Sequence, residues 1–585
     1  MPLGVSVLSL VLMKGAVNNF PRVDEVGHLP AGVSHWKFLR FDMYRVNPPL
    51  VRSLVTIGAP SDFDWSLYSD KSRQRPEFSI GGKKLHDEGL VFHERFVVPR
   101  ILGLTVFVVS VFLLFVLVRT TAGRVPAILA VVLFAFDPNV LANAVAITPD
   151  VGALCGGLAI GLIGLRYCKQ RSSALSLGIA AGVAALTKLT WVTLVVSLPV
   201  TILCCRWSTG SKGLSLSSVF ELWLGFILIV NLGYAFEGVL VPLEEYEFCS
   251  QSLSGCEVPG VIGNRFAGTI AGRIPIPFPR NYILGMDFLR MEVEQKMWSF
   301  LLGEWKYGSW PHYYLMTTLF KTPDTTLLAA LIGLGVLVAG VRRRMVQPEV
   351  LSMFLFLAIP AGVCFASVSL QGGFNHHHRY VLMIYPCMFA LASYVASPTS
   401  VRLLRFRLPF LGPNKRSIAV PLAVTLVVLS AASSLQVHPY YTSYFNWLSG
   451  GPGNGWRVLG FSNIDWGQDI LEVDNWLKAH PDRHPLVMDI DYFNLNGDLF
   501  GVPTADPPQL PRGASIDEIR KGISETQWWI ISVKKLYNLP GCEGLEYLQQ
   551  IQPVERIAYA YHVYRIDPLP SVPMMGETPA FSPLE

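Results

Sequence analysis

The stretch VVPRILGLTVFVVSVFLLFVLV, residues 97–118, decides the fold class, because Arg100 is its only charged residue. A run of this length and composition is typical of a helix that crosses a lipid bilayer, for which about 20 apolar residues are needed. The rest of the chain agrees: 51% of the 585 residues are hydrophobic, only 15% are charged, and the mean hydropathy is +0.40. The sequence therefore predicts an α-helical protein that crosses the membrane several times.

Further apolar runs bring the predicted number of spans to about eleven. These runs are residues 3–17, 125–146, 151–165, 174–187, 189–205, 216–235, 323–341, 350–370, 379–397 and 417–436. Every second connection between them is rich in Lys and Arg, as cytoplasmic loops are. The alternation predicts a cytoplasmic N-terminus. It also puts two large loops, 20–96 and 237–320, on the extracytoplasmic face.

After residue 436 the composition becomes that of a soluble protein. The pattern predicts a helix at Ile470–Ala479 and strands at Pro485–Ile490, Trp528–Val533 and Ala558–Tyr564. We therefore expect two domains, a transmembrane domain at 1–436 and a small extracytoplasmic α/β domain at 437–585.

Cysteine spacing and charge exclude two kinds of site. The nine cysteines form no CxxC pair, so a structural zinc site is not expected. Cys249 and Cys256 flank a polar outer loop, where a disulfide and two free thiols are both open interpretations. The net charge of +5 lies in short clusters between apolar runs, which is not the pattern of a nucleic-acid-binding protein.

Carboxylates mark the predicted outer boundary of the membrane. Asp24 and Glu25 follow the first apolar run, with His28 four residues after Asp24, and Asp150 begins another run. A carboxylate at this depth is by default a hypothesis about function, here contact with a lipid-borne phosphate or an acceptor hydroxyl. The alternatives are a solvated loop start for Asp24 and Glu25, and a favourable helix N-terminus for Asp150.

Basic side chains gather at the same predicted boundary. Lys188 lies at a turn between two runs, Lys321 precedes another run, and Arg379 follows the three histidines His376–His378. A guanidinium group fits the oxygens of a phosphate, whereas snorkelling toward water is the alternative for Lys188. Acids and bases on one face predict a site for a charged lipid headgroup.

Several motifs occur in an order that is shared with a known family. They are Asp24-Glu25 with His28, Asn47-Pro48-Pro49-Leu50, Pro138-Asn139, Thr148-Pro149-Asp150, Leu186-Thr187-Lys188, Tyr282-Ile283-Leu284-Gly285, His312-Tyr313-Tyr314, Lys321-Thr322-Pro323, Arg379-Tyr380, Tyr385-Pro386, Tyr444-Phe445-Asn446, Gly450-Gly451-Pro452 and Ser462–Asp469. Over nearly its whole length the chain resembles the phospholipid carrier-dependent glycosyltransferases of the GT-C fold. That group includes protein O-mannosyltransferases and lipid A aminoarabinose transferases. The chain departs from the family at Val46-Asn47, where an acidic residue and His are frequent.

The resemblance implies an inverting hexosyl or pentosyl transferase in the plasma or inner membrane. Its donor would be a polyprenyl-phosphate-linked sugar, and its acceptor a hydroxyl of a protein, lipid or glycan. Asp24 would act as general base or orient the acceptor, and Asp150 would assist. A divalent ion such as Mg²⁺ or Mn²⁺, held by Asp24 and Asp150, is left open. Asp465-Trp466-Gly467 is interpreted either as a sugar-binding surface or as a turn packed by Trp466.

The candidate site residues fall into three groups. The catalytic candidates are Asp24, Glu25 and Asp150, the phosphate-binding candidates are Lys321, Arg379, His378 and Lys188, and the substrate-binding candidates are His28, Asn47, Tyr313 and Tyr380. A transporter or flippase of lipid-linked or anionic substrates is the alternative function. Such proteins place polar groups near the midplane and often have two related halves, neither of which the sequence shows.

Overall fold

The computed structural model describes residues 2–68, 75–209, 215–406 and 416–569, and the chain divides into two compact units, Met1–Leu471 and Glu472–Glu585. The sequence had placed this division after residue 436. The segment that follows residue 436 belongs to the first unit because Tyr441 and Tyr444 are buried in its hydrophobic core. The amide of Asn446 also donates hydrogen bonds to the carbonyls of Leu319 and Thr322.

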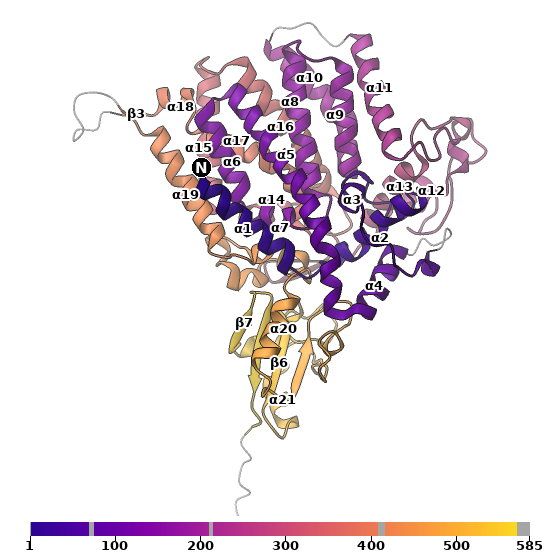
Figure 1. Ribbon diagram of the computed structural model, residues 1–585, viewed down its shortest axis with the longest axis vertical. Helices are drawn as coiled ribbons and strands as arrows, with labels where there is room; N and C mark the ends of the chain where they lie inside the picture. The colour runs from indigo at the N-terminus through magenta and orange to yellow at the C-terminus, as the bar shows by residue number, and fades with distance from the viewer. Residues whose placement is uncertain (1, 69–74, 210–214, 407–415, 570–585) are drawn as a thin grey trace, which may run out of the picture. The chain divides into compact units, whose positions relative to one another are not determined.

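Apolar helices of different lengths make up most of the first unit (Figure 1). Their bounds are α1 Pro2–Asn18, α5 Val97–Thr121, α6 Arg124–Phe136, α7 Pro138–Ala144, α8 Asp150–Cys168, α9 Ala174–Thr187, α10 Leu194–Thr209, α11 Leu216–Gly233, α15 Asp324–Arg342, α16 Pro348–Leu370, α17 Tyr385–Tyr394 and α19 Ala419–Leu435. Close packing of α9 on α11 depends on a missing side chain, since a Cβ at Gly178 would lie 2.1 Å from the carbonyl oxygen of Leu222. Small residues at such contacts are typical of helices that associate in membranes.

Within the described residues, seven helices are long and apolar enough to cross a membrane, and an eighth results if α6 and α7, bent by 62°, form one span. The predicted number of about eleven is therefore not confirmed. The remaining predicted runs form α1, this bent pair, and the shorter helices α9 and α19. The bend occurs where Asp137 and Pro138 interrupt the apolar run, because proline lacks the N–H that a continuous helix needs.

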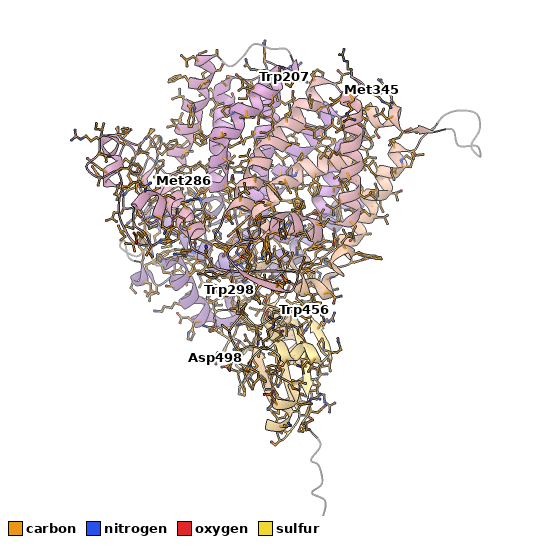
Figure 2. All side chains as sticks on the ribbon, turned by 180° about the vertical axis from the view of Figure 1, so that it is seen from behind. Trp207, Met286, Trp298, Met345, Trp456 and Asp498 are labelled. Atoms are coloured by element: carbon orange, nitrogen blue, oxygen red, sulfur yellow. The ribbon has the colours of Figure 1, made fainter. Side chains whose placement is uncertain are left out.

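The two ends of the bundle differ in their connections. Trp207 and Met345 lie at the same end in Figure 2, whereas Trp298 lies toward the other end. Trp207 and Met345 neighbour two of the basic connections, 206–212 and 342–344. Their shared end agrees with the alternation of charge in the sequence, and the cytoplasmic assignment of that end stays a prediction.

Shorter elements cover the end that holds the candidate site. They are α2 Val23–Phe38, α3 Leu50–Val55, α4 Pro76–Glu88, α12 Gln251–Ser254, α13 Arg280–Glu294, the antiparallel hairpin of β1 Trp298–Leu301 and β2 Glu304–Tyr307, α14 Tyr313–Lys321, and two 3₁₀ helices, η3 Leu189–Thr193 and η6 His378–Ile384. Neither Cys249 nor Cys256 forms a disulfide among the described residues. The disulfide interpretation is therefore wrong, and Cys249 instead donates its N–H and its thiol to Oδ2 of Asp287, at 2.7 and 3.1 Å.

The second unit is a small α/β fold, as the sequence predicted. Its four-stranded sheet has the order β5-β6-β8-β7, with β5 Leu486–Asp489 parallel to β6 Gln527–Ser532. Strand β6 is antiparallel to β8 Tyr561–Ile566, which pairs with β7 Glu555–Ile557. Helix α20, Ile470–Ala479, has the predicted bounds, and α21 covers Ile516–Gly522.

Candidate active site

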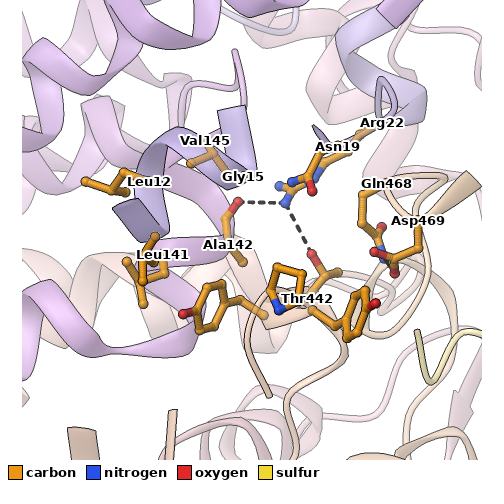
Figure 3. A pocket seen from close by; sticks show the side chains of 14 residues that line it. Leu12, Gly15, Asn19, Arg22, Leu141, Ala142, Val145, Thr442, Gln468 and Asp469 are labelled. Atoms are coloured by element: carbon orange, nitrogen blue, oxygen red, sulfur yellow. Dashed lines mark hydrogen bonds between the residues drawn. The ribbon is translucent and has the colours of Figure 1, made fainter. Parts of the chain in front are cut away.

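A cavity of about 820 Å³ lies within the first unit. Side chains from α2, α8, α13, α16, η3 and η6 line it, together with the loop that carries Asn47. The volume is in the range of sites that enclose small ligands. A second, much smaller pocket beside Arg22 has a volume of about 10 Å³, too small for a substrate, and Figure 3 shows Arg22 donating to the carbonyl of Ala142 and to Oγ1 of Thr442.

Four charged side chains form a row on the wall of the large cavity. Nη2 of Arg379 donates to Oδ2 of Asp24 at 2.7 Å, and Nη1 of Arg379 lies 3.6 Å from Oδ2 of Asp150. Nζ of Lys188 donates to Oδ1 of Asp150 at 2.6 Å. We call this row Asp24–Arg379–Asp150–Lys188 the charge row. Its acids and bases alternate and balance, which is how charges are accommodated away from water.

The local sequence explains where these four residues stand. Asp24 lies in the first turn of α2 and Asp150 begins α8, so each carboxylate is at a helix N-terminus, where the backbone dipole favours negative charge. Lys188 follows the last residue of α9, and Arg379 lies in η6. Four separate elements thus converge, and Asp150 is fully buried while Asp24 keeps 20% of its side chain exposed.

Some buried polar atoms of this region have no hydrogen-bond partner among the described residues. They are Oδ2 of Asp150, Nε of Arg379 and both ring nitrogens of His28. Buried polar atoms are nearly always hydrogen-bonded, and exceptions often mark functional sites. His28 packs on the ring of Tyr44 at 4.6 Å, and burial, with Arg52 nearby, lowers its pKa to about 3. Its imidazole is therefore neutral at physiological pH.

Two of the predicted substrate-binding residues line the large cavity. Asn47 and Tyr380 are both part of its wall. The ring of Tyr380 lies 5.4 Å from Nζ of Lys188 and 5.5 Å from the guanidinium of Arg379. An aromatic face at this distance attracts a cation, so Tyr380 helps to hold the basic half of the charge row.

Other predicted residues lie behind the cavity rather than in its described lining. His378 contacts Oγ1 of Thr317 and the hydroxyl of Tyr385 through its two ring nitrogens, at 2.9 and 2.8 Å. The hydroxyl of Tyr313 accepts a hydrogen bond from Asn463 at 2.9 Å. Direct contact of these side chains with substrate stays a prediction, and the contacts shown are with protein.

Glu25 connects the start of α2 to the bundle. Its carboxylate receives Nη2 of Arg100 at 2.7 Å, the N–H of Arg22 at 2.9 Å and the N–H of Ile147 at 3.0 Å. Burial by itself would raise the pKa of Glu25, but Arg100 and Arg22 hold it below the ordinary value. These contacts support a structural function for Glu25, with its neighbour Asp24 facing the cavity.

Lys321 is also surrounded by protein. Its Nζ donates to the carbonyls of Thr442 and Asn463, each at 2.7 Å, and lies 4.4 Å from the ring of Phe445. Burial lowers its pKa to about 7. A neutral amine still has two N–H groups, enough for both carbonyls. A contact between Lys321 and a carrier phosphate stays a prediction.

Lys321 gives a pH dependence that can be tested. Its folded pKa of about 7 is below the ordinary 10.5, so the unfolded chain binds more protons between these values and stability rises with pH across this window. The shift corresponds to at most about 5 kcal/mol. We expect the unfolding midpoint of the wild type minus that of Lys321→Met, both measured in detergent, to increase from pH 7 to pH 9.5. Parallel pH profiles of the two proteins would contradict this.

Sequence reasoning missed two residues on the cavity wall, and it left two interpretations open for Trp466. Arg75 and Glu292 form an ion pair on its wall, although they are 217 positions apart and no local pattern connects them. The ring of Trp466 lies 3.9 Å from the guanidinium of Arg379. Trp466 is only 6% exposed, so the interpretation as a packed turn is closer to the structure than a sugar-binding surface.

The charge row does not fit a divalent metal ion as it stands. Asp24 and Asp150 both contact Arg379, and Asp150 also binds Lys188, so an added metal ion would meet two cations. Among the described residues no group of three His, Cys, Asp or Glu side chains is placed to hold a metal. We therefore assign no step of the chemistry to a metal ion.

Comparisons with known proteins give one family match and several similar solved structures. The profile of the family described as dolichyl-phosphate-mannose-protein mannosyltransferase matches residues 90–232. Crystal structures of ArnT from Cupriavidus metallidurans, bound to undecaprenyl phosphate, and of the oligosaccharyltransferase of Archaeoglobus fulgidus are each 12% identical to this chain, with TM-scores of 0.43 and 0.41. The alignments cover 96% and 86% of this chain, and 97% and 64% of those chains. No curated protein matches. The family match supports, over residues 90–232, the resemblance to glycosyltransferases that use a phospholipid carrier.

Proposed function

We propose that this protein is an inverting glycosyltransferase that moves a sugar from a polyprenyl-phosphate carrier to an acceptor hydroxyl. The observation that carries the proposal is the charge row, in which two carboxylates and two cations meet on the wall of one cavity. A base for the acceptor and ligands for a phosphate are thus adjacent, as a glycosyl phosphate donor requires. The match to the mannosyltransferase family supports the same chemistry.

Arg379 and Lys188 are the proposed ligands of the carrier phosphate. The guanidinium presents a planar fork to phosphate oxygens, and the ammonium adds a second charge. Both side chains are 10% exposed, so their charges are poorly screened by water. Negative charge grows on the phosphate as the sugar leaves, and fixed cations at that position stabilise the transition state.

Asp24 is the proposed general base. The acceptor oxygen forms a bond to the anomeric carbon while the bond from that carbon to the phosphate oxygen breaks. The carboxylate of Asp24 takes the hydroxyl proton, and the carrier leaves as polyprenyl phosphate. Because the nucleophile enters opposite the leaving group, the anomeric configuration inverts. Proton transfer to a positioned base contributes about 10²- to 10⁴-fold to such a rate.

Asp150 has a different role in this proposal. It is fully buried and contacts both Lys188 and Arg379, so it holds the two phosphate ligands at a constant separation. A carboxylate engaged with two cations is a weak base. We therefore assign orientation of the phosphate-binding groups to Asp150.

The remainder of the cavity suits a lipid-linked donor. Leu189 and Val192 of η3, and Val368 and Leu370 of α16, line it beside the charge row. Leu370 is 77% exposed on a helix that is apolar enough to cross the membrane. A carrier headgroup at the charge row could thus continue into an isoprenoid chain along an apolar wall.

The central experiment is incubation of purified protein with a panel of radiolabelled polyprenyl-phosphate hexoses and pentoses. We expect one donor to be consumed, with release of polyprenyl phosphate, when a protein, lipid or glycan acceptor is present. A transporter or flippase would redistribute the lipid across a vesicle membrane without cleaving it. Failure to consume any donor on all three acceptor classes would contradict the proposed function.

The charge row also predicts that transfer needs no added metal ion. Because the two carboxylates already hold cations, we expect EDTA at millimolar concentration to change the rate by less than about twofold, which is below 0.5 kcal/mol. The measurement is the initial rate of donor consumption before and after chelation, with Mg²⁺ or Mn²⁺ added back. Loss of activity that either ion restores would show that Asp24 and Asp150 rearrange around a metal.

The proposal places the reaction outside the cytoplasm of a cell with a plasma or inner membrane. The cavity is formed at the ends of α8 and α16 that are remote from the basic connections. Single cysteines introduced at exposed loop positions should therefore react with an impermeant thiol reagent in intact cells when they neighbour the cavity. Labelling at the opposite end only would reverse the assignment.

A further inference from the structure

Trp466 contacts Arg379 and the residue before Asp24, although it comes from a segment that follows the last apolar helix. Its ring lies 3.9 Å from the guanidinium carbon of Arg379. Its carbonyl accepts the N–H of Val23, the residue before Asp24, at 3.1 Å. Trp466 thus contacts the proposed phosphate ligand and also the backbone immediately before the proposed base.

The segment around Trp466 is itself firmly held in place. The N–H of Trp466 donates to Oε1 of Gln468 at 2.8 Å, and the carbonyl of Gln468 accepts the N–H of Phe20 at 3.0 Å. Asn463 donates its amide to the hydroxyl of Tyr313, and its Oδ1 accepts the N–H of His378, at 2.9 and 2.8 Å. The segment is therefore attached both to the start of α2 and to the start of η6.

We propose that Trp466 is a positioning residue, which holds the guanidinium of Arg379 against Asp24 in the orientation that receives a phosphate. This inference rests on the proposed function and extends it to a residue outside the described lining of the cavity. A free arginine side chain has many rotamers, and each of the two carboxylates beside Arg379 could draw it away from the other. An aromatic face restricts the plane of the guanidinium without using its N–H donors.

The interaction also explains why a buried tryptophan stands here. Its indole attracts the cation through the ring face, while its carbonyl accepts the N–H of Val23 in the first turn of α2, where Asp24 also lies. The positions of Asp24 and Arg379 relative to each other therefore both depend on Trp466. A side chain without an aromatic face would keep the hydrogen bond to Val23 and lose the hold on Arg379.

The test compares Trp466→Leu, Trp466→Phe and the control Trp456→Leu. Trp456 is a suitable control because it is similarly buried, at 5% against 6% exposed, and has the guanidinium of Arg457 4.5 Å from its ring. We expect Trp466→Leu to lower kcat/KM for the donor by about tenfold, and Trp466→Phe, which keeps an aromatic face, by less than about threefold. Trp456→Leu should stay within about twofold of the wild type. Equal losses in both leucine variants would overturn the inference.

A binding cycle separates positioning from a general loss of structure. The probe is sugar-free undecaprenyl phosphate in detergent, bound to the wild type, Trp466→Leu, Arg379→Ala and the double variant. If Trp466 acts through Arg379, the double variant should bind no more weakly than Arg379→Ala alone. Independent, additive losses would overturn the inference. A wild type that consumes no donor would overturn the proposed function, whereas an active wild type with an equally active Trp466→Leu would overturn only this inference.

Discussion

Asp24→Asn should lower sugar transfer by about 10²- to 10⁴-fold, the contribution of a positioned general base. Asparagine keeps the shape of the side chain and accepts a hydrogen bond from Arg379, but its amide cannot take the acceptor proton. The carrier phosphate should still bind, because Arg379 and Lys188 remain. The measurement is single-turnover consumption of the donor identified by the panel, combined with binding of sugar-free carrier.

A matched control for this variant lies in the same stretch of residues, 20–96. Asp62 pairs with Arg95, and its side chain is 56% exposed. Exposed ion pairs contribute little to stability, so Asp62→Asn should stay within about twofold of wild-type activity. If Asp24→Asn retained full transfer with a folded protein, Asp24 would not be the base.

Arg379→Ala should have the second large effect, a loss of transfer of about 10²- to 10³-fold. It removes the group that contacts both Asp24 and Asp150 and that would face the departing phosphate. We also expect carrier binding to weaken by at least about tenfold, the usual cost of one charged contact. Donor consumption and binding of sugar-free carrier measure the two effects.

A second substitution keeps this prediction testable if the alanine variant is unstable. Removing one partner of a buried ion pair leaves an uncompensated charge, which costs about 3–5 kcal/mol. Arg379→Lys keeps the charge and loses the planar fork, so it should fold and show an intermediate defect. The control is Arg40→Ala, because Arg40 is 39% exposed and pairs with Asp42 away from the described cavity lining. Wild-type transfer in Arg379→Lys and Arg379→Ala alike would show that the guanidinium has no part in the reaction.

Part of the candidate site was predictable because its signals are local. Asp24 lies in the first turn of a helix that follows an apolar run, and Asp150 begins an apolar helix, which made both visible as carboxylates at the predicted membrane boundary. Arg379 was visible for the same reason, at the start of another run. Glu25, adjacent to Asp24, had the same local signal, yet it points to Arg100. Neighbouring residues of a helix point in directions about 100° apart, and only the packed structure selects which of them faces the cavity.

The sequence predicts that the chain is a membrane protein more reliably than it predicts the number of membrane spans. Apolar composition is a property of each segment and predicts burial in lipid or protein equally well. Helix α9 is highly buried between α8 and α11, and α6 breaks at Pro138, so neither is a simple lipid-facing span. Hydropathy cannot distinguish these cases.

By itself, the sequence determined that this is a helical membrane protein with a small α/β unit after it, since apolar runs, helix starts and strand patterns depend on residues close together in the chain. Only the tertiary structure decided which charged groups meet. Asp24 and Arg379 are 355 positions apart, and Trp466, which contacts Arg379 and the backbone of Val23, lies farther still along the chain. Such contacts depend on how the helices pack and on where each side chain points, and no local pattern of residues encodes either.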